Sequence, residues 1–450
     1  MEKNDKNYLL LIAAHVLIGI FIYIVPSSAK LYAAAMLALG VFLVIKTHNQ
    51  SHEVLLVSGY LVGSEVFLRM TQGNLVYEFA KYGVMSFVFF GMYYRGFSKN
   101  AVQYWLFLLL LIPGVILGTY NLNYNSDLAK IISFNLSGPL CLGVASLYTY
   151  TRKVSIENLH RIMLCMGLPV VSCATYLFLF TPSVREIVTG TGSNFETSGG
   201  FGPNQVSTIL GLGAFVFFSR AFFASRTKLI FMVNLGLALL ISYRGLVTFS
   251  RGGMVTAAGM LVVLIIVTYM KVGKRSRGKL NILLVVFMTA VFAVWSYSSF
   301  ETGGLIEKRY ANQDAAGRVK KSRFTGREEI SKHEIEAFLS APVLGIGMGK
   351  GFEQRENDYG ILVLSHNEIT RMMAEHGAFG ILGLLIIFST PFFLYLDNKQ
   401  HIYMACFVFF WLLTINHAAM RTAAPAFVYA LSILKVVNYE KPVVRREQAV

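Results

Sequence analysis

The sequence predicts an all-α, polytopic integral membrane protein with about 12–14 transmembrane helices. Its composition is the first observation: 55% of the 450 residues are hydrophobic and 14% are charged, with a mean hydropathy of +0.56. A soluble domain has about 25% charged residues. The second observation is a series of apolar runs, and the third is the placement of lysine and arginine in alternate loops. Together these patterns exclude soluble enzymes and secreted modules.

Apolar runs near the length of a membrane span, roughly 20 residues, recur along the chain. We expect fourteen of them, at 8–25, 31–45, 54–67, 75–94, 102–120, 129–148, 159–180, 205–223, 229–248, 253–270, 281–300, 377–396, 402–416 and 425–437. The second, third, thirteenth and fourteenth are short, so twelve spans with re-entrant pieces is an alternative. The first run has no small-residue cleavage site, which favours a retained span over a signal peptide.

The basic residues predict the topology. Starting with Lys3 and Lys6, alternate loops contain lysine and arginine, whereas opposite short loops such as 121–127 nearly lack them. This is the positive-inside pattern, and it predicts that both termini are cytoplasmic. The net charge of +16 then indicates contact with anionic membrane lipids, and we expect no nucleic-acid partner.

One connection differs from the others in length and polarity. It divides the chain into helices 1–11 at 1–300, a long extracytoplasmic loop at 301–376 that we expect to contain the catalytic site, the last helices at 377–438, and a cytoplasmic tail at 439–450. Loops this long are usually functional or disordered. No internal repeat is visible, so the inverted-repeat plan of many transporters has no support.

Basic residues gather between 308 and 327, including Arg323 and Arg327. They form either a solvated loop or a site for a polyanion such as a diphosphate, which arginine binds bidentately. The spacing predicts an amphipathic helix over 327–340. The glycines of 344–352 then predict a tight turn with close backbone approach.

The segment Ser365-His366-Asn367-Glu368 has the pattern of a capping box, which would place His366 at the first helical position. The helix dipole there disfavours an imidazolium, so His366 would be a neutral imidazole able to accept a proton. A solvated histidine in a polar loop is the alternative. Gly377 is expected to end this helix or to bend it into the next span.

Two arginines lie at the outer end of predicted spans. Arg251 sits in the turn 249–253, and Arg244 lies seven residues earlier on the same helix face. An ionisable residue at membrane depth is a functional candidate, with snorkelling to the headgroups as the alternative. Gly252 and Gly253 would allow another element to approach Arg251 closely.

Two further clusters are expected at the same surface. Glu65/Arg69 and Glu78/Lys81 have spacings at which helical side chains meet, and structural ion pairing is the favoured interpretation. Pro203 and Asn204 suit a helix start whose free N–H groups could meet an anion. The cysteines all lie inside apolar runs, so we expect no metal site. These features predict an outward-facing site for an anionic, lipid-borne substrate.

Short motifs in the second half of the chain resemble a known family. In order, they are FGPN at 201–204, TFSRGG at 248–253, TGR at 325–327, APVLGIG at 341–347, SHN at 365–367 and EHG at 375–377. The set resembles the bacterial O-antigen ligase and polymerase superfamily, which are integral-membrane glycosyltransferases of the GT-C type. The resemblance covers roughly 198 to the C-terminus.

The resemblance implies a function. The donor would be a glycan on undecaprenyl diphosphate and the acceptor a lipid A-core hydroxyl, at the periplasmic face of the inner membrane. Arg251 and Arg327 would hold the diphosphate and His366 would activate the acceptor, in an inverting reaction without metal or cofactor. Candidates for further substrate contacts are Arg244, Asn204, Arg323, Asn367 and Arg69. Two features depart from the family: fourteen spans exceed the usual twelve, and Phe249 stands where a small polar residue is common.

Three alternatives to a ligase stay open. A polymerase of the same superfamily would use the same donor and extend the glycan. A lipid-linked oligosaccharide flippase would also have many spans, but its charges should follow a central path. A membrane scaffold leaves the outer arginines unexplained. Both nonenzymatic hypotheses predict that His366→Ala leaves surface glycan intact.

Overall fold

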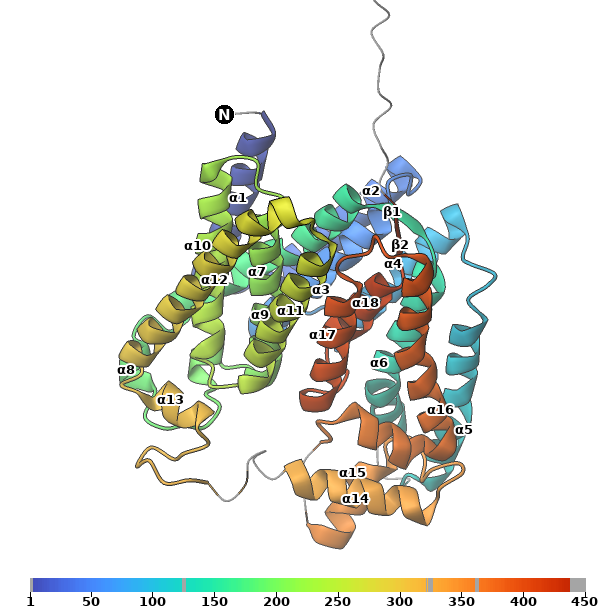
Figure 1. Ribbon diagram of the computed structural model, residues 1–450. Coiled ribbons are helices and arrows are strands. Elements are labelled where there is room, and N and C mark those ends of the chain that lie inside the picture. The colour runs from blue at the N-terminus through green and yellow to red at the C-terminus, as the bar shows by residue number, and fades with distance from the viewer. Residues whose placement is uncertain (1–2, 124–126, 321, 323–326, 361–363, 438–450) are drawn as a thin grey trace, which may run out of the picture.

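The computed structural model describes residues 3–123, 127–320, 322, 327–360 and 364–437. This part of the chain is almost entirely helical (Figure 1). The long helices are α1 (Lys3–Ile24), α2 (Ser28–Thr47), α3 (Glu53–Met70), α4 (Phe79–Arg95), α5 (Val102–Asn121), α6 (Leu128–Thr149), α7 (Ile156–Phe180), α9 (Pro203–Phe223), α10 (Lys228–Leu246), α11 (Arg251–Lys271), α12 (Lys274–Glu301) and α16 (Glu368–Asp397). The shorter elements are β1 (Lys153–Ser155), α8 (Val184–Ile187), η1 (Glu196–Ser198), α13 (Leu305–Tyr310), α14 (Arg327–Ser340), α15 (Lys350–Tyr359), α17 (Met404–His417), α18 (Ala423–Ser432) and β2 (Lys435–Val437).

Each of the fourteen expected runs contains a helix, and among the described residues ten helices are long and apolar enough to cross a membrane. The remaining four expected runs contain α3, α4, α17 and α18, which do not meet this criterion of length and apolar composition. Most of the α3 residues are buried, including the charged Glu65. A helix surrounded by protein can carry such a residue because its partners also come from the protein. The prediction of an all-α polytopic membrane protein is therefore confirmed.

The last expected run, 425–437, was wrong at its end. The helix stops at Ser432, and β2 pairs in parallel with β1, with Lys435 opposite Lys153. Val436 is buried by this pairing, so the apolar pattern reflects a buried strand. A short apolar run does not distinguish a helix from a buried strand by itself.

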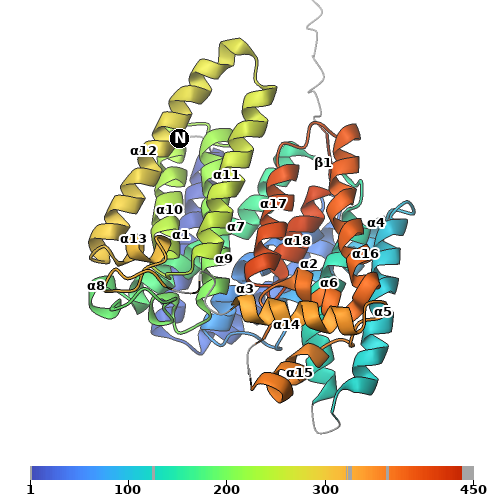
Figure 2. The same ribbon diagram turned by 60° about the horizontal axis from the view of Figure 1, so that its bottom comes forward.

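The helices form two groups that meet along α11 and α17 (Figures 1 and 2). One contains α1, α7 and α9–α12, and the other contains α5, α6 and α16–α18. Glycines allow close packing at the junction. A Cβ on Gly253 would lie 2.2 Å from the carbonyl carbon of Ser207 in α9, and one on Gly252 would lie 2.4 Å from Cδ2 of His417 in α17. The expectation that these two glycines admit other elements next to Arg251 is confirmed.

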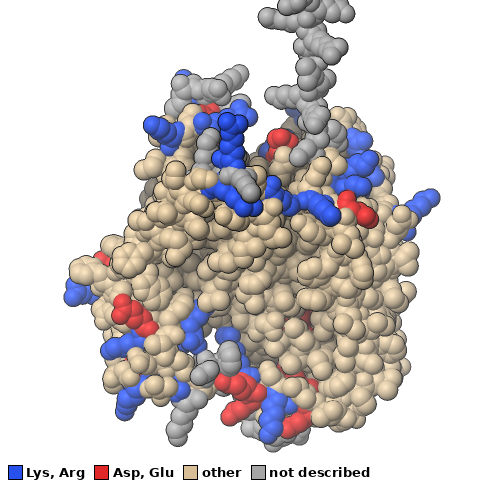
Figure 3. Space-filling view, viewed as in Figure 1, with Lys and Arg blue, Asp and Glu red and all other residues tan. Residues whose placement is uncertain are grey.

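The short helices α8, α13, α14 and α15 all lie at one end of the bundle, at the bottom of Figure 1. We call this the loop end. The start of α1 lies at the opposite end, where lysine and arginine side chains crowd the surface in Figure 3. The loop end carries both signs of charge. The loops that contain the predicted site residues therefore come together on one side of the molecule.

A kink in α16 anchors these loops. At Gly377 the backbone leaves the helical conformation (φ 57°, ψ −136°), which confirms the predicted bend. The glycine-rich segment enters this kink: Ile346 N donates to Ala374 O at 2.9 Å and Gly347 N to Glu375 O at 3.2 Å. Gly345 and Gly347 have φ of 75° and 98°, a region that glycine adopts without steric cost. The glycines therefore form the expected tight turn, and they serve the fold.

Candidate functional site

Two adjoining cavities open at the loop end. One, of about 530 Å³, is lined by His366, Asn367, Glu328 and Ser331 among others, and we call it the histidine cavity. The second, of about 620 Å³, is the arginine cavity, lined by Asn204, Ser250, Arg251, Arg309, Tyr310, Asn312 and others. The two share Gly252, Val255, Arg327 and His417. Figure 3 shows the surface hollowed at this end, with lysine or arginine side chains at the rim.

The arginine cavity is built around the turn between α10 and α11. Phe249 has φ 58°, which is unusual for a residue other than glycine. Its ring is fully buried in a small apolar cluster with Val184 and Ile306. The Phe249 carbonyl accepts a hydrogen bond from Arg309 Nε at 2.8 Å, and Arg251 Nη1 donates to Arg309 O at 3.4 Å. Phe249 thus anchors α13 against the turn that presents Arg251, which explains an aromatic residue at this position.

Three arginines line this cavity, from three different elements: Arg251 begins α11, Arg309 lies in α13 and Arg327 begins α14. Burial, followed by the nearby Arg251 and Arg327, lowers the pKa of Arg309 to about 10. Burial and Arg251 also lower the pKa of Arg327. Both shifts mean that the positive charges are destabilised where they stand. An anion in the cavity would relieve this repulsion.

Asn204 lines the arginine cavity from the first turn of α9, and its predicted contact with substrate stays a prediction. Pro203 begins that helix, as expected. Ser250 Oγ donates to Asn204 Oδ1 at 2.8 Å, while Ser207 Oγ donates to Ser250 O at 2.8 Å. These bonds fasten the start of α9 to the residue before Arg251.

His366 lies outside α16, so the predicted capping box is wrong. Asn367 is the N-cap, and its Oδ1 accepts from Ile369 N at 2.9 Å. Ser365 Oγ turns back to Asn367, accepting from its N at 3.2 Å and donating to its O at 3.0 Å. Glu368 bonds with Arg371 and so does not close a capping box. Asparagine is as good an N-cap as serine. The charge-assisted bond between Glu368 and Arg371 is stronger than the bond from the Glu368 carboxylate to a backbone N–H that a capping box would require.

The imidazole of His366 is nonetheless held neutral. Burial, then the charges of Arg421 and Arg327 and the neighbouring His417, lower the pKa of His366 to about 3. Its Nδ1 is buried and has no hydrogen-bond partner within the part of the chain that the structure describes.

Two predicted contact residues lie away from both cavities. The buried Arg244 donates to Thr181 O and Thr197 O, each at 3.3 Å, and so holds the 181–197 loop. Arg69 pairs with Glu65 at 2.8 Å and with Glu78 at 3.3 Å, and Lys81 pairs with Glu78 at 2.9 Å. The structural interpretation of these ion pairs is confirmed.

Of the other predicted contact residues, Asn367 lines the histidine cavity, although its side chain also caps α16. Arg323 lies outside the described residues.

His417 lines both cavities and was not predicted from the sequence. Its Nδ1 is 2.7 Å from Leu413 O, its Nε2 is 3.1 Å from Thr208 Oγ1, and its carbonyl accepts from Arg327 Nη1 at 3.2 Å. The signal that selected Arg251, a polar residue at the outer end of a span, applies equally to His417. Arg309 was not singled out because it is one of many basic residues between 308 and 327. Arg421 lies just after an apolar span, as His417 lies at the end of one.

The described residues contain no group of three or more His, Cys, Asp or Glu side chains placed to hold a metal ion. The charged groups that face the cavities are mainly arginines, which bind phosphates directly.

Comparison with known proteins agrees with the motifs. Residues 236–388 match the family model described as O-antigen ligase. The match runs from α10 to α16 and includes Arg251, Arg327 and His366, whereas Asn204 and His417 lie outside it. No curated protein matches the chain. This match and the ordered motifs support similarity to the O-antigen ligase superfamily over residues 236–388, about a third of the chain.

Proposed function

We propose that this protein is an O-antigen ligase-like glycosyltransferase that moves a glycan from undecaprenyl diphosphate to a lipid A-core or other surface hydroxyl. The family supports a glycosyltransferase of the ligase or polymerase type. The observation that carries the finer proposal is the joint between the two cavities, where Arg327 reaches both the arginine cavity and the cavity of His366.

The arginine cavity suits a diphosphate. A guanidinium presents parallel N–H donors that match phosphate oxygens, and Arg251, Arg309 and Arg327 line the cavity from three different elements. Preplaced cations stabilise the charge that develops on a leaving diphosphate. This arrangement supports a reaction in which the arginines supply the stabilisation and no metal is needed.

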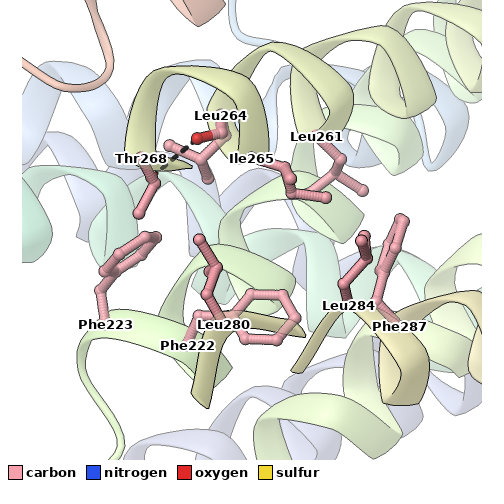
Figure 4. Close-up of a pocket in the computed structure, with 9 residues that line it drawn as sticks. All are labelled: Phe222, Phe223, Leu261, Leu264, Ile265, Thr268, Leu280, Leu284 and Phe287. Carbon is pink, nitrogen blue, oxygen red and sulfur yellow. Dashed lines mark hydrogen bonds between the residues drawn. The ribbon is translucent and has the colours of Figure 1, made fainter. Parts of the chain in front are cut away.

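An apolar path supports a lipid-linked donor. A cavity of about 180 Å³ between α9, α10, α11 and α12 shares Val255 and Tyr310 with the arginine cavity. It shares Leu261 and Phe287 with the apolar pocket of Figure 4, which lies further along the same helices. The pocket in Figure 4 is lined by leucine, isoleucine and phenylalanine side chains, with Thr268 as its polar member. A polyprenyl chain could extend along this path while its diphosphate occupies the arginine cavity.

The histidine cavity would hold the acceptor. Neutral His366 takes the proton of the acceptor hydroxyl while that oxygen forms a bond to the anomeric carbon of the donor. The bond from this carbon to the diphosphate oxygen breaks, and its electron pair leaves with the diphosphate bound by Arg251 and Arg327. A single displacement of this kind inverts the anomeric carbon. General-base help of this type contributes about 10²–10⁴-fold.

We infer from the positive-inside pattern that the loop end faces the periplasm, with the protein in the inner membrane and both termini in the cytoplasm. The crowding of basic side chains at the opposite end supports this orientation (Figure 3). No nucleotide is available on the periplasmic side, which suits a donor activated beforehand as a lipid diphosphate.

The test is transfer in proteoliposomes supplied with undecaprenyl-diphosphate-linked glycan and lipid A-core, without nucleotide or metal. Wild type should label the acceptor, and Arg251→Ala and His366→Ala should not. Matched controls are Arg318→Ala, an exposed arginine paired with Asp314, and His333→Ala in α14. Both should retain transfer.

Longer lipid-linked glycan without acceptor labelling would assign the polymerase reaction instead. Movement of lipid-linked glycan across the bilayer with no covalent product would contradict the enzymatic proposal.

A further inference from the structure

The turn that joins α17 to α18, residues 418–422, bonds to the chain around His366 at three points, two on the backbone and one on a side chain. Ala419 N donates to His366 O at 3.0 Å, and Met420 N donates to the Glu368 carboxylate at 3.3 Å. Arg421 Nη2 donates to Ser365 O at 2.6 Å. The peptide groups on both sides of the imidazole are therefore fixed by one short segment that is more than 50 residues away in sequence.

The other side of this turn is attached to the buried ion-pair cluster. Glu65 Oε2 accepts from Ala423 N at 2.7 Å, and Arg69 Nη2 donates to Arg421 O at 3.3 Å. Glu65 is 1% exposed, and it forms its ion pair with Arg69 one turn further along α3. The turn is thus held between α3 and His366, and this gives the Glu65/Arg69 pair a place in the support of the site.

Several charged or titratable groups surround His366. Arg421 comes from the turn, Arg327 and Glu328 from α14, His417 from α17 and Glu368 from α16. Glu334 of α14 also contacts the neighbouring Ser365. After burial, the charge of Arg421 is the largest influence that lowers the pKa of His366. Arg421 does not line either cavity among the residues described, so its action on a substrate would be indirect.

We propose that Arg421 is a positioning residue for His366: its guanidinium fixes the Ser365 carbonyl and places a positive charge beside the imidazole. The inference rests on the proposed function for its catalytic consequence, because that function makes His366 the base. Its structural content, that Arg421 controls the protonation and placement of His366, can be measured without turnover.

The measurement is residue-specific carbethoxylation of His366 by diethyl pyrocarbonate, followed by mass spectrometry, between pH 4 and 8 on the full-length protein. Wild type should react at a nearly constant rate, because only the neutral imidazole reacts. Arg421→Gln keeps a donor for Ser365 O and removes the charge. It should raise the pKa of His366, so that reactivity falls about twofold or more at the acid end.

Two further variants separate charge from folding. Arg421→Lys keeps the charge and should leave the titration of His366 unchanged. This variant tests the role of the charge even where Arg421→Gln folds poorly. Arg244→Gln is a matched control, since Arg244 is also a buried arginine that donates to loop carbonyls. It should leave the titration unchanged.

Transfer kinetics give the second readout. Arg421→Ala, which removes the donor to Ser365 O, should lower kcat about tenfold at neutral pH without changing the KM for the donor, and Arg421→Lys should restore part of the rate. If His366 titrates identically in wild type, Arg421→Gln and Arg421→Lys, the inference is wrong, whatever the activity. If His366→Ala keeps full transfer while Arg421→Gln shifts the titration, the proposed function fails and the positioning role stands.

Discussion

Buried and half-buried arginines occur in two settings in this molecule, with different partners. Arg69 and Arg371, inside the helix bundle, pair with carboxylates from their own or neighbouring helices. Arg309 and Arg327, at the cavities, donate to the Phe249 and His417 carbonyls. A carboxylate partner neutralises the arginine, whereas a carbonyl orients it and leaves its charge in place. The comparison indicates that the first set holds helices together and that the second set is available to an anion.

The largest effect should come from breaking a carboxylate-paired arginine. Arg371→Met leaves the carboxylates of Glu368 and Glu375 buried without their partner, which typically costs 3–5 kcal/mol. Equilibrium unfolding in detergent should show this loss. The double variant Arg371→Met/Glu368→Gln should recover part of it, because one buried charge is removed. An Arg371→Met protein as stable as wild type would contradict the structural role of the carboxylate-paired arginines.

Arg327→Gln should show the opposite pattern. We expect transfer to fall by about 10²–10³-fold, the usual effect of removing one group that stabilises developing charge. The free energy of unfolding should not fall, because the substitution relieves repulsion with Arg251. Arg318→Gln on the exposed part of the loop is the control. Equal rates for the two variants would show that Arg327 does not meet the diphosphate.

The fold could be predicted where a segment's structure is determined by its own residues and not by distant contacts. The 327–340 helix, the Gly377 bend and the glycine-rich turn all follow from local spacing or backbone demands. The cap of α16 was mispredicted because Ser365 and Asn367 are both good caps, and the tertiary contacts of Glu368 decide between them.

The site was predictable only in part for a related reason. Arg251, Arg327, His366 and Asn204 reach the cavities, and each stands at the end of a span or helix. Arg244 has the same local signal, but its carbonyl partners Thr181 and Thr197 come from a distant part of the chain. Arg69 has it too, but it is engaged by the nearby Glu65 and Glu78. His417 and Arg421 act through residues about 50 to 210 positions away, and no pattern in a single sequence contains that information.

A smaller effect should follow from Gly252→Ala. The new Cβ would lie 2.4 Å from His417 Cδ2, so the histidine between the two cavities must move. Overpacking of this kind costs about 1–3 kcal/mol. Gly236→Ala in α10 is the matched control, because nothing lies within 4 Å of its Cβ. Unfolding and transfer assays should both show a loss for Gly252→Ala, and equal behaviour of the two variants would contradict the close contact.

The smallest effect concerns pH. The pKa of His366 is lowered to about 3 by burial, Arg421 and Arg327, so its neutral form is present throughout pH 5–8. Because the neutral form is the base, transfer should not decline through protonation of His366 until the pH approaches that pKa. A free histidine would be half protonated near pH 6.5. A rate that halves at pH 6.5 in wild type, and does not in a variant at another histidine, would contradict this account.

Whether the arginine cavity holds the diphosphate is tested most directly by the binding of undecaprenyl diphosphate to the detergent-solubilised protein, measured by isothermal titration calorimetry. Wild type and Arg244→Gln should bind with similar affinity. Arg251→Gln/Arg327→Gln should lose about 100-fold or more, since each charged hydrogen bond is worth about 1.5–3 kcal/mol. If the double variant binds as tightly as wild type, the arginine cavity is not the diphosphate site.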